Sequence, residues 1–256
     1  MNRWNGQATP GQATTPVVLG ANYSGDMAGH TLSDAVVAVI GASGALGSII
    51  SRELAERGSK VILVGRSEQR LRDVGLEDAT VVVADLTDAT AGDSIVAAAK
   101  EAHGRLDGVI NAAGVVAFGS LADTEDAIIE ELFMTNVIGP LFLLRRVTPL
   151  LAESKGFVVN ISAVVAEKPM AGMAAYSATK AALTAASHAL GRELRKSGLD
   201  VYDVRPPHTE TGLVNRALAG QAPKLPEGLA PEVTAKRIVD AIEAGQFDVM
   251  AADFSS

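Results

Sequence analysis

The sequence predicts an α/β fold in which a doubly wound parallel sheet forms a single domain. Two observations support this class. Short apolar runs rich in β-branched residues alternate with amphipathic helical segments from residue 35 to about 245, and this alternation is typical of βαβ units. The composition is 48% hydrophobic but only 4% aromatic, so the core is aliphatic, as in sheets that are covered on both faces.

The expected elements follow one another in regular order. Strands are predicted in the ranges 35–41, 60–66, 79–86, 106–114, 156–162 and 199–207, and helices in the ranges 46–58, 91–104, 124–152, 173–197 and 231–245. A strand that is followed by a helix and then by a parallel strand implies a right-handed crossover. Ligands of such sheets bind beyond the carboxyl ends of the strands, so functional residues are expected directly after each strand.

The domain organisation is predicted to be simple. Residues 1–33 are rich in Gly, Thr, Pro, Asn and Gln and are expected to form a flexible leader, although Trp4 and the apolar stretch 17–19 could dock it on a neighbouring surface. Residues 34–256 are expected to form the folded domain. The start lacks the apolar stretch of a secretory signal, and no later run is expected to be long enough to span a bilayer. We therefore expect a cytoplasmic protein without a membrane partner.

Composition also limits the partners. The net charge is -8 and no basic cluster is present, which argues against nucleic acid, because neutralising phosphates requires grouped Lys and Arg. The chain has no cysteine, and its four histidines show no ligand spacing. No disulfide framework and no metal site are therefore expected.

A glycine-rich loop, "GASGALG" at 41–47, stands between the first strand and the first helix. Glycines at this place permit a tight turn and let backbone N–H groups approach a pyrophosphate at the positive end of the helix. The alternative is a plain glycine-rich turn. The position in a βαβ unit favours dinucleotide binding.

The end of the second strand predicts which dinucleotide is bound. Gly65 occupies the place where an acidic residue would bind the ribose hydroxyls of NAD, and Arg66 follows it. A guanidinium can hold a 2′-phosphate, which favours NADP(H), unless Arg66 is an ordinary solvated charge. Asp85 ends the third strand and is expected to bind the adenine amino group; the alternative is a turn or helix-cap role.

Tyr176 and Lys180 stand four positions apart in "AAYSATKAAL", on one face of a predicted helix. The alternative is that the phenol packs in the core while the lysine extends to water. Asn136 lies on an otherwise apolar helix face with Ile129, Leu132 and Phe133. A buried amide must be hydrogen-bonded, so a functional role and a structural one at a helix kink both remain open.

Together these features resemble the short-chain dehydrogenase/reductase family over residues 35 to about 245. The likeness rests on the glycine loop, "NAAG" at 111–114, Asn136 in "TNVIG", "YSATK" at 176–180 and "RPPHTET" at 205–211. The resemblance implies a Rossmann-type fold and hydride transfer with NADP(H). It implies that Tyr176 is the acid/base, that Lys180 stabilises its phenolate and binds the nicotinamide ribose, and that Asn136 holds a water of a proton relay.

The resemblance also implies a cofactor site. Asn111 is expected to lock neighbouring strands through its side chain, and Gly114 to give the cofactor room. The backbone around Thr209 is expected to face the nicotinamide carboxamide, and Thr211 to offer a hydroxyl. The expected cofactor-binding residues are Gly41, Ser43, Leu46, Gly47, Arg66, Asp85, Leu86, Asn111, Ala112, Gly114, Tyr176, Lys180, Pro206, Thr209 and Thr211.

The chain departs from the family pattern at the residue that orients the substrate. The family's serine stands thirteen positions before the tyrosine, where this chain has Ala163, and Ser162 precedes it. Three hypotheses follow: a local shift presents Ser162 as a catalytic residue; the enzyme works with Tyr176 alone or with a hydroxyl from elsewhere; or catalysis is lost. Pro206-Pro207 replaces the family's Pro-Gly, and His208 beside it is either a surface residue or a substrate contact.

The sequence therefore predicts an NADP(H)-dependent oxidoreductase that interconverts a ketone or aldehyde and an alcohol. Its small-molecule substrate is expected to be hydrophobic, because the expected pocket walls at 114–119, 164–173 and 211–226 are mainly apolar. The alternative is a catalytically impaired NADP(H)-binding regulatory or assembly protein. The chain ends without the glycine-rich tail of many relatives, so a homodimer through the helices at 124–152 and 173–197 is expected rather than a tetramer.

Overall fold

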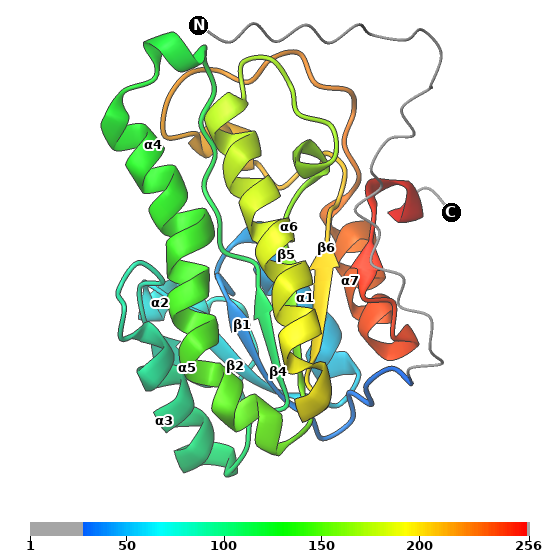
Figure 1. The fold of residues 1–256 in the computed structure, drawn as a ribbon. Helices are drawn as coiled ribbons and strands as arrows, with labels where there is room; N and C mark the ends of the chain where they lie inside the picture. Colours follow the sequence, from blue (N-terminus) through cyan, green and yellow to red (C-terminus); the bar gives the residue numbers. More distant parts are fainter. Residues whose placement is uncertain (1–27, 255–256) are drawn as a thin grey trace, which may run out of the picture.

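A seven-stranded parallel sheet organises the computed structural model, which describes residues 28–254 (Figure 1). The strand order β3-β2-β1-β4-β5-β6-β7 reverses direction at β1, as in a doubly wound Rossmann-type fold. The predicted fold class is thus confirmed. The strands are β1 (Val36–Ile40), β2 (Lys60–Gly65), β3 (Thr80–Val83), β4 (Gly108–Asn111), β5 (Phe157–Ile161), β6 (Asp200–Val204) and β7 (Asp248–Val249).

Helices cover both faces of the sheet. They are α1 (Ala45–Glu56), α2 (Glu68–Arg72), α3 (Ala91–His103), α4 (Asp126–Phe133), α5 (Gly139–Glu153), α6 (Ala174–Leu194) and α7 (Pro231–Ala244). In Figure 1, α6 crosses in front of the sheet and α1 lies behind it. Neither α2 nor β7 was predicted from the sequence. With five residues and two residues respectively, they are too short to show a hydrophobic period.

Successive side chains of a strand point alternately into two apolar cores, one on each face of the sheet. Val37 and Val39 of β1 pack with Ile50 of α1 and Ile238 of α7. Their neighbours Val36, Ala38 and Ile40 pack with side chains of α3 and α5. All five residues of β1 are buried, which explains why the strand reads as a continuous apolar run instead of an alternating one.

The register brings the strand ends to one edge. Ile40 of β1 pairs with Val64 of β2 and with Asn111 of β4, while Ile161 of β5 pairs with Val204 of β6. The residues that follow these strands therefore lie along the same edge, although they are far apart in the sequence. This edge is where the functional residues were predicted.

The end of the predicted leader belongs to the packed domain. Leu32 is 1% exposed, and the ring of His30 lies 4.8 Å from the ring of Phe157. Nε2 of His30 is 3.0 Å from Asp200 Oδ2, and a Cβ on Gly29 would lie 1.9 Å from the Glu243 carbonyl oxygen. Residues 28–33 thus pack on the domain, and the rest of the expected leader lies outside the described residues.

The predicted helix at 124–152 is one helix of 28 residues, Asp126–Glu153, interrupted by a π-helical turn at Met134–Ile138. Its mean hydropathy over the best window is 1.6, so by length and composition it could cross a membrane. The expectation that no run is long enough is wrong in that respect. The helix nevertheless places Leu143, Val147 and Leu151 in the core against the sheet, as a core helix does.

The close contact of β4 with β5 gives a test of this packing. A Cβ on Gly108 would lie 2.3 Å from Cζ of Phe157, so we expect Gly108→Ala to lower the free energy of unfolding by about 1–3 kcal/mol, because the core is overpacked. Urea unfolding measures this. Combining it with Phe157→Leu, which removes the ring atoms, should give a loss smaller than the sum of the two single losses; strict additivity would contradict the assigned contact.

Candidate active site

Helix α6 brings Tyr176 and Lys180 together at the carboxyl edge of the sheet. Both side chains are buried, with 7% and 4% of their surfaces exposed. Nζ of Lys180 lies 5.9 Å from the centroid of the Tyr176 ring and donates a hydrogen bond to the carbonyl oxygen of Ile161, 3.0 Å away at the end of β5. The lysine is therefore held inside the fold, and the alternative in which it extends to water does not apply.

Burial sets the proton affinities of this pair. Burial lowers the pKa of Lys180 to about 8, against an opposing effect of the Asp203 carboxylate. Burial also raises the pKa of Tyr176 above its usual value, because an apolar environment disfavours the phenolate. The attraction between ammonium and phenolate is thus only one of two effects on this pair. Burial makes it costly to form the Tyr176 phenolate, and a cation beside the phenol must offset this cost.

Asn136 lies in the π-helical turn and is buried. Its Oδ1 accepts from the Val115 N–H at 2.9 Å, and its Nδ2 donates to the Val115 carbonyl oxygen at 2.9 Å and to Thr179 Oγ1 at 3.1 Å. The amide thus joins the long helix to the chain after β4 and to α6. This is the structural role left open above. The water-holding role stays a prediction.

The two residues after β5 have different surroundings. The Ser162 hydroxyl donates to Asp203 Oδ1 at 2.7 Å and lies 2.9 Å from Thr184 Oγ1, whereas Ala163 packs against the apolar cluster that contains Tyr176. Ala163 is extended, with φ -172° and ψ 162°, so no bulge turns Ser162 round. The hypothesis that Ser162 faces the substrate is therefore corrected: its hydroxyl is bound to Asp203.

The glycine loop forms a cradle at the start of α1. Gly41 has φ +76°, and a Cβ on Gly47 would lie 2.3 Å from the Gly41 carbonyl oxygen. The helix has Gly44 at its N-cap and no side-chain cap, so the N–H groups of its first turn remain available to an anion. A Cβ on Gly114 would lie 3.5 Å from Lys180 Nζ. Gly114 thus places no side chain of its own beside that ammonium, which is compatible with a nicotinamide cofactor there.

A cavity of about 310 Å³ opens beside the ends of β2 and β3. Its lining includes the two residues predicted to recognise the nucleotide and the start of α3: Arg66, Val83, Ala84, Asp85, Asp88, Thr90, Ala91 and Ser94. Within the described part of the chain, the exposed Arg66 guanidinium has no hydrogen-bond or ion-pair partner. Oδ1 of Asp85 accepts from the Thr87 N–H at 2.9 Å, so the turn role left open for Asp85 is present.

A second arginine, which was not predicted as a site residue, lies at this place. Nη2 of Arg70, on α2, donates to the Ser43 carbonyl oxygen at 3.2 Å. A Cβ on Gly65 would lie 3.4 Å from Ser43 Oγ. Arg66, Arg70 and the Ser43 hydroxyl are thus gathered at the end of β2. The only signal in the sequence was an arginine four positions after Arg66, on a helix too short to predict.

Asn111 differs from its predicted role. It is 1% exposed, yet neither atom of its amide has a hydrogen-bond partner among residues 28–254. The prediction that this side chain locks neighbouring strands is wrong, because the backbone ladder alone pairs β4 with β1 and β5. A buried amide requires a hydrogen-bond partner, and residues 28–254 supply none, which fits a bound cofactor or water. Its neighbours Ala112 and Ala113 pack closely on Gly41.

The segment after β6 is held mainly by its own contacts. The Pro206 carbonyl oxygen accepts from the Val164 N–H at 2.9 Å. The Thr209 hydroxyl bonds to the Pro207 carbonyl oxygen at 3.1 Å, and Thr211 Oγ1 accepts weakly from the Leu213 N–H at 3.4 Å. His208 Nε2 lies 3.2 Å from Glu210 Oε1. These side chains stabilise the segment, and the cofactor contacts expected of its backbone stay predictions.

Residues 211–222 form a cover over the tyrosine. This cover arches over the upper end of α6 in Figure 1, and its Leu213, Val214 and Leu218 pack against the cluster that contains Tyr176. Two backbone hydrogen bonds attach it to the chain after β4. The Leu218 N–H donates to the carbonyl oxygen of residue 116 at 2.8 Å, and the N–H of residue 118 donates to the Ala219 carbonyl oxygen at 2.9 Å. The cover explains the low exposure of Tyr176.

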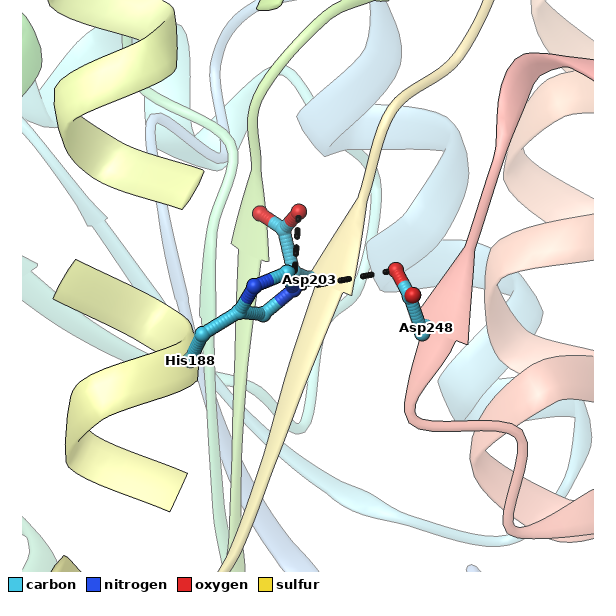
Figure 2. A group of neighbouring side chains, drawn as sticks. All are labelled: His188, Asp203 and Asp248. Atoms are coloured by element: carbon cyan, nitrogen blue, oxygen red, sulfur yellow. Dashed lines mark ion pairs between the residues drawn. The ribbon is translucent and has the colours of Figure 1, made fainter. Parts of the chain in front are cut away.

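An ion cluster that the sequence did not reveal lies behind the pair. Arg205 bonds through its guanidinium to Asp203 on β6, to Asp248 on β7 and to Glu167 after β5. Figure 2 shows His188 of α6 pointing between the two aspartates, with Nε2 3.9 Å from Asp203 Oδ2 and 3.8 Å from Asp248 Oδ1. The imidazole and carboxylates could ligate a cation, but the guanidinium already binds both aspartates, so we assign no metal.

Comparison with known proteins agrees with this geometry. A family model described as short chain dehydrogenase matches residues 35–222. An uncharacterized oxidoreductase of Staphylococcus epidermidis is 31% identical over 198 residues, covering 76% of this chain and 86% of the relative. One from Staphylococcus aureus strain MW2 is 30% identical over 217 residues, covering 82% of this chain and 92% of the relative.

Solved structures are similar in fold. A short-chain dehydrogenase from Streptomyces avermitilis has a TM-score of 0.77 at 29% identity, covering 87% of this chain and 91% of that one. A short chain dehydrogenase from Burkholderia cenocepacia J2315 in complex with NADP has a TM-score of 0.76 at 25% identity, covering 86% of this chain and 89% of that one. Fold, motif order and sequence similarity thus agree, and the chain belongs to the short-chain dehydrogenase family of oxidoreductases.

Proposed function

We propose that this protein is an NADP(H)-dependent oxidoreductase that interconverts a hydrophobic ketone or aldehyde and the corresponding alcohol. The observation that carries the proposal is the buried Tyr176–Lys180 pair beside Gly114, which places no side chain of its own next to the ammonium. A phenol and an ammonium at a strand edge, next to a glycine cradle for a dinucleotide, suit proton transfer coupled to hydride transfer.

In this proposal the residues divide the chemistry. Tyr176 gives its proton to the carbonyl oxygen in reduction and removes the proton of the alcohol in oxidation. Lys180 stabilises the resulting phenolate, since burial alone disfavours that ion. Asn136 holds the chain after β4 against α6 and so fixes the wall around Lys180. When bound, NADP(H) supplies or accepts the hydride.

Two observations favour NADP(H) over NAD(H). Arg66 has no partner among the described residues and borders the cavity that we assign to the adenosine, with Arg70 and Ser43 close by. A guanidinium without a partner can bind a 2′-phosphate in bidentate fashion. The similar protein from Burkholderia cenocepacia is in complex with NADP.

The substrate is proposed to be apolar. Around Tyr176, the walls consist of Val116, Ala117, Phe118, Val165 and Met173, together with the cover. Such walls offer few polar partners, so binding must come mainly from apolar contact. A cytoplasmic location and a homodimer stay predictions from the sequence.

A second function is favoured by one observation, the alanine at position 163. With no hydroxyl at that position, the chain lacks the expected donor to the substrate oxygen, and Ser162 does not replace it. In this alternative the protein binds NADP(H) as a regulatory or assembly protein. Loss of one such donor typically slows an enzyme by about 10²–10³ without abolishing catalysis, so we prefer the enzyme.

Tyr176→Phe tests the acid/base role. We expect turnover to fall by about 10² or more, because the proton donor is lost, while NADPH binding stays intact. Oxidation of NADPH, followed by its absorbance over a panel of aryl and alkyl ketones and aldehydes, measures turnover, and NADPH fluorescence measures binding. Equal turnover in the variant would contradict the role of Tyr176; tight NADPH binding without turnover on any compound would favour the regulatory alternative.

Arg66→Ala tests the cofactor preference. We expect the Kd for NADPH to rise about 10- to 100-fold, because charged hydrogen bonds to the 2′-phosphate are lost, and the Kd for NADH to change little. Arg72→Ala is the matched control, since Arg72 lies on α2 and is paired with Glu68 at 2.6 Å. Equal effects of Arg66→Ala on both cofactors would refute the assignment.

Ala163→Ser tests the missing donor. Because Ala163 packs in the cluster of Tyr176, a hydroxyl at this position should reach the substrate oxygen and raise kcat about 10²-fold. Ala163→Cys is the control, since it is similar in size and a weak donor. A Cys variant as fast as the Ser variant would attribute the gain to packing.

A further inference from the structure

The polar face of α6 extends beyond the Tyr176–Lys180 pair. Thr184 and His188 follow Lys180 at intervals of four residues, so all four side chains lie along one face of the helix. Thr184 Oγ1 lies 3.2 Å from Asp203 Oδ1, and His188 Nε2 lies 3.9 Å from Asp203 Oδ2. The helix face that carries the pair thus continues into the ion cluster of Figure 2.

Asp203 is the innermost charge of that cluster, with 1% of its surface exposed. One carboxylate oxygen accepts from the hydroxyls of Ser162 and Thr184, and the other binds the Arg205 guanidinium. Arg205 also binds Asp248 and Glu167. One guanidinium therefore serves three carboxylates, so it does not cancel the negative charge of Asp203.

Two short connections lead from Asp203 to Lys180. The first runs along β5: Lys180 Nζ donates to the carbonyl oxygen of Ile161, and the next residue, Ser162, donates to Asp203. The second runs along α6, where Thr184 lies one turn after Lys180 and bonds to the same carboxylate oxygen. Both the acceptor of the lysine and its own helix are thereby held by one buried carboxylate.

We propose that Asp203 is a positioning residue for the Tyr176–Lys180 pair, a buried carboxylate that keeps Lys180 protonated and directed at the end of β5. The inference rests on the proposed function for its catalytic meaning. It also gives Ser162 a role. Its hydroxyl hydrogen-bonds Asp203 and so holds the carboxylate next to Ile161, whose carbonyl oxygen accepts from Lys180.

The electrostatics of the surroundings agree with this proposal. Burial lowers the pKa of Lys180 to about 8, and the Asp203 carboxylate acts in the opposite direction. Tyr176 on α6 faces Lys180, while His188 on α6 and Arg205, directly after β6, face Asp203. Two further carboxylates, Asp248 on β7 and Glu167 after β5, bind Arg205.

Asp203→Asn in the full chain tests the proposal through the protonation of Lys180. Side-chain NMR of lysine labelled with carbon-13 and nitrogen-15, with the Lys180 signal assigned by its loss in Lys180→Met, follows the titration without any substrate. We expect the Lys180 midpoint to move down by on the order of one pH unit, since the negative charge that opposes the effect of burial on this lysine is lost. An unchanged midpoint would overturn the proposal.

Asp248→Asn is the charge-matched control, because it removes one negative charge on the far side of Arg205. We expect this variant to shift the Lys180 midpoint less than half as much; an equal shift would also overturn the specific role of Asp203. Asp203→Asn leaves Arg205 short of a partner inside the fold, which can prevent folding. Asp203→Asn/Arg205→Gln removes both charges of the ion pair, and Arg205→Gln alone gives its reference: a Lys180 midpoint in the double variant that does not fall below that of Arg205→Gln would overturn the proposal.

The pH profile of kcat separates this inference from the proposed function. If the protein turns over a ketone, the profile of Asp203→Asn should move by the same amount as the Lys180 midpoint, while the profile of Asp248→Asn stays near the wild type. A shifted Lys180 midpoint in a protein without turnover would refute the oxidoreductase proposal alone. Turnover with an unshifted midpoint would refute the role of Asp203 alone.

Discussion

An ammonium buried at the end of a strand is the constraint on which the rest of this structure depends. Lys180 is 4% exposed, and a charge in that environment is tolerated only where the fold supplies partners. The Ile161 carbonyl oxygen is the direct partner, and Asp203 is the nearby opposite charge. Lys180 therefore links three elements: α6, which carries it, the end of β5, which accepts its hydrogen bond, and β6, which carries Asp203.

This coupling explains why the polar residues at the back of the site are arranged as they are. A buried carboxylate needs its own partners, and Asp203 finds them in two hydroxyls and Arg205. Arg205 in turn reaches Glu167 in the loop after β5 and Asp248 on the edge strand β7. The same interactions that compensate the charge of Lys180 thus attach a loop and the last strand to the sheet.

The fold could be predicted from the sequence because a parallel sheet buries both faces of its strands and leaves an unmistakable alternation of apolar runs and amphipathic helices. The short elements α2 and β7 were missed, since neither is long enough to show a period. In the site, the helix spacing of Tyr176 and Lys180 brought the two side chains together as expected. The hydrogen-bond partners of the Ser162 hydroxyl and the lack of a partner for the Asn111 amide among the described residues could not be predicted, because both depend on which residues lie next to them in the folded chain. The ion cluster was invisible for the same reason: its members come from α6, β6, β7 and a loop.

The cover at 211–222 has a consequence for selectivity. Its apolar side chains pack against the residues around Tyr176, so a substrate of the proposed reaction would have to replace part of this packing to reach the phenol. Only a compound whose hydrocarbon area matches that of the displaced leucines and valine recovers the lost contacts. In the proposed reaction, small hydrophilic carbonyl compounds would not recover these contacts, and the Tyr176 phenol would be shielded from them.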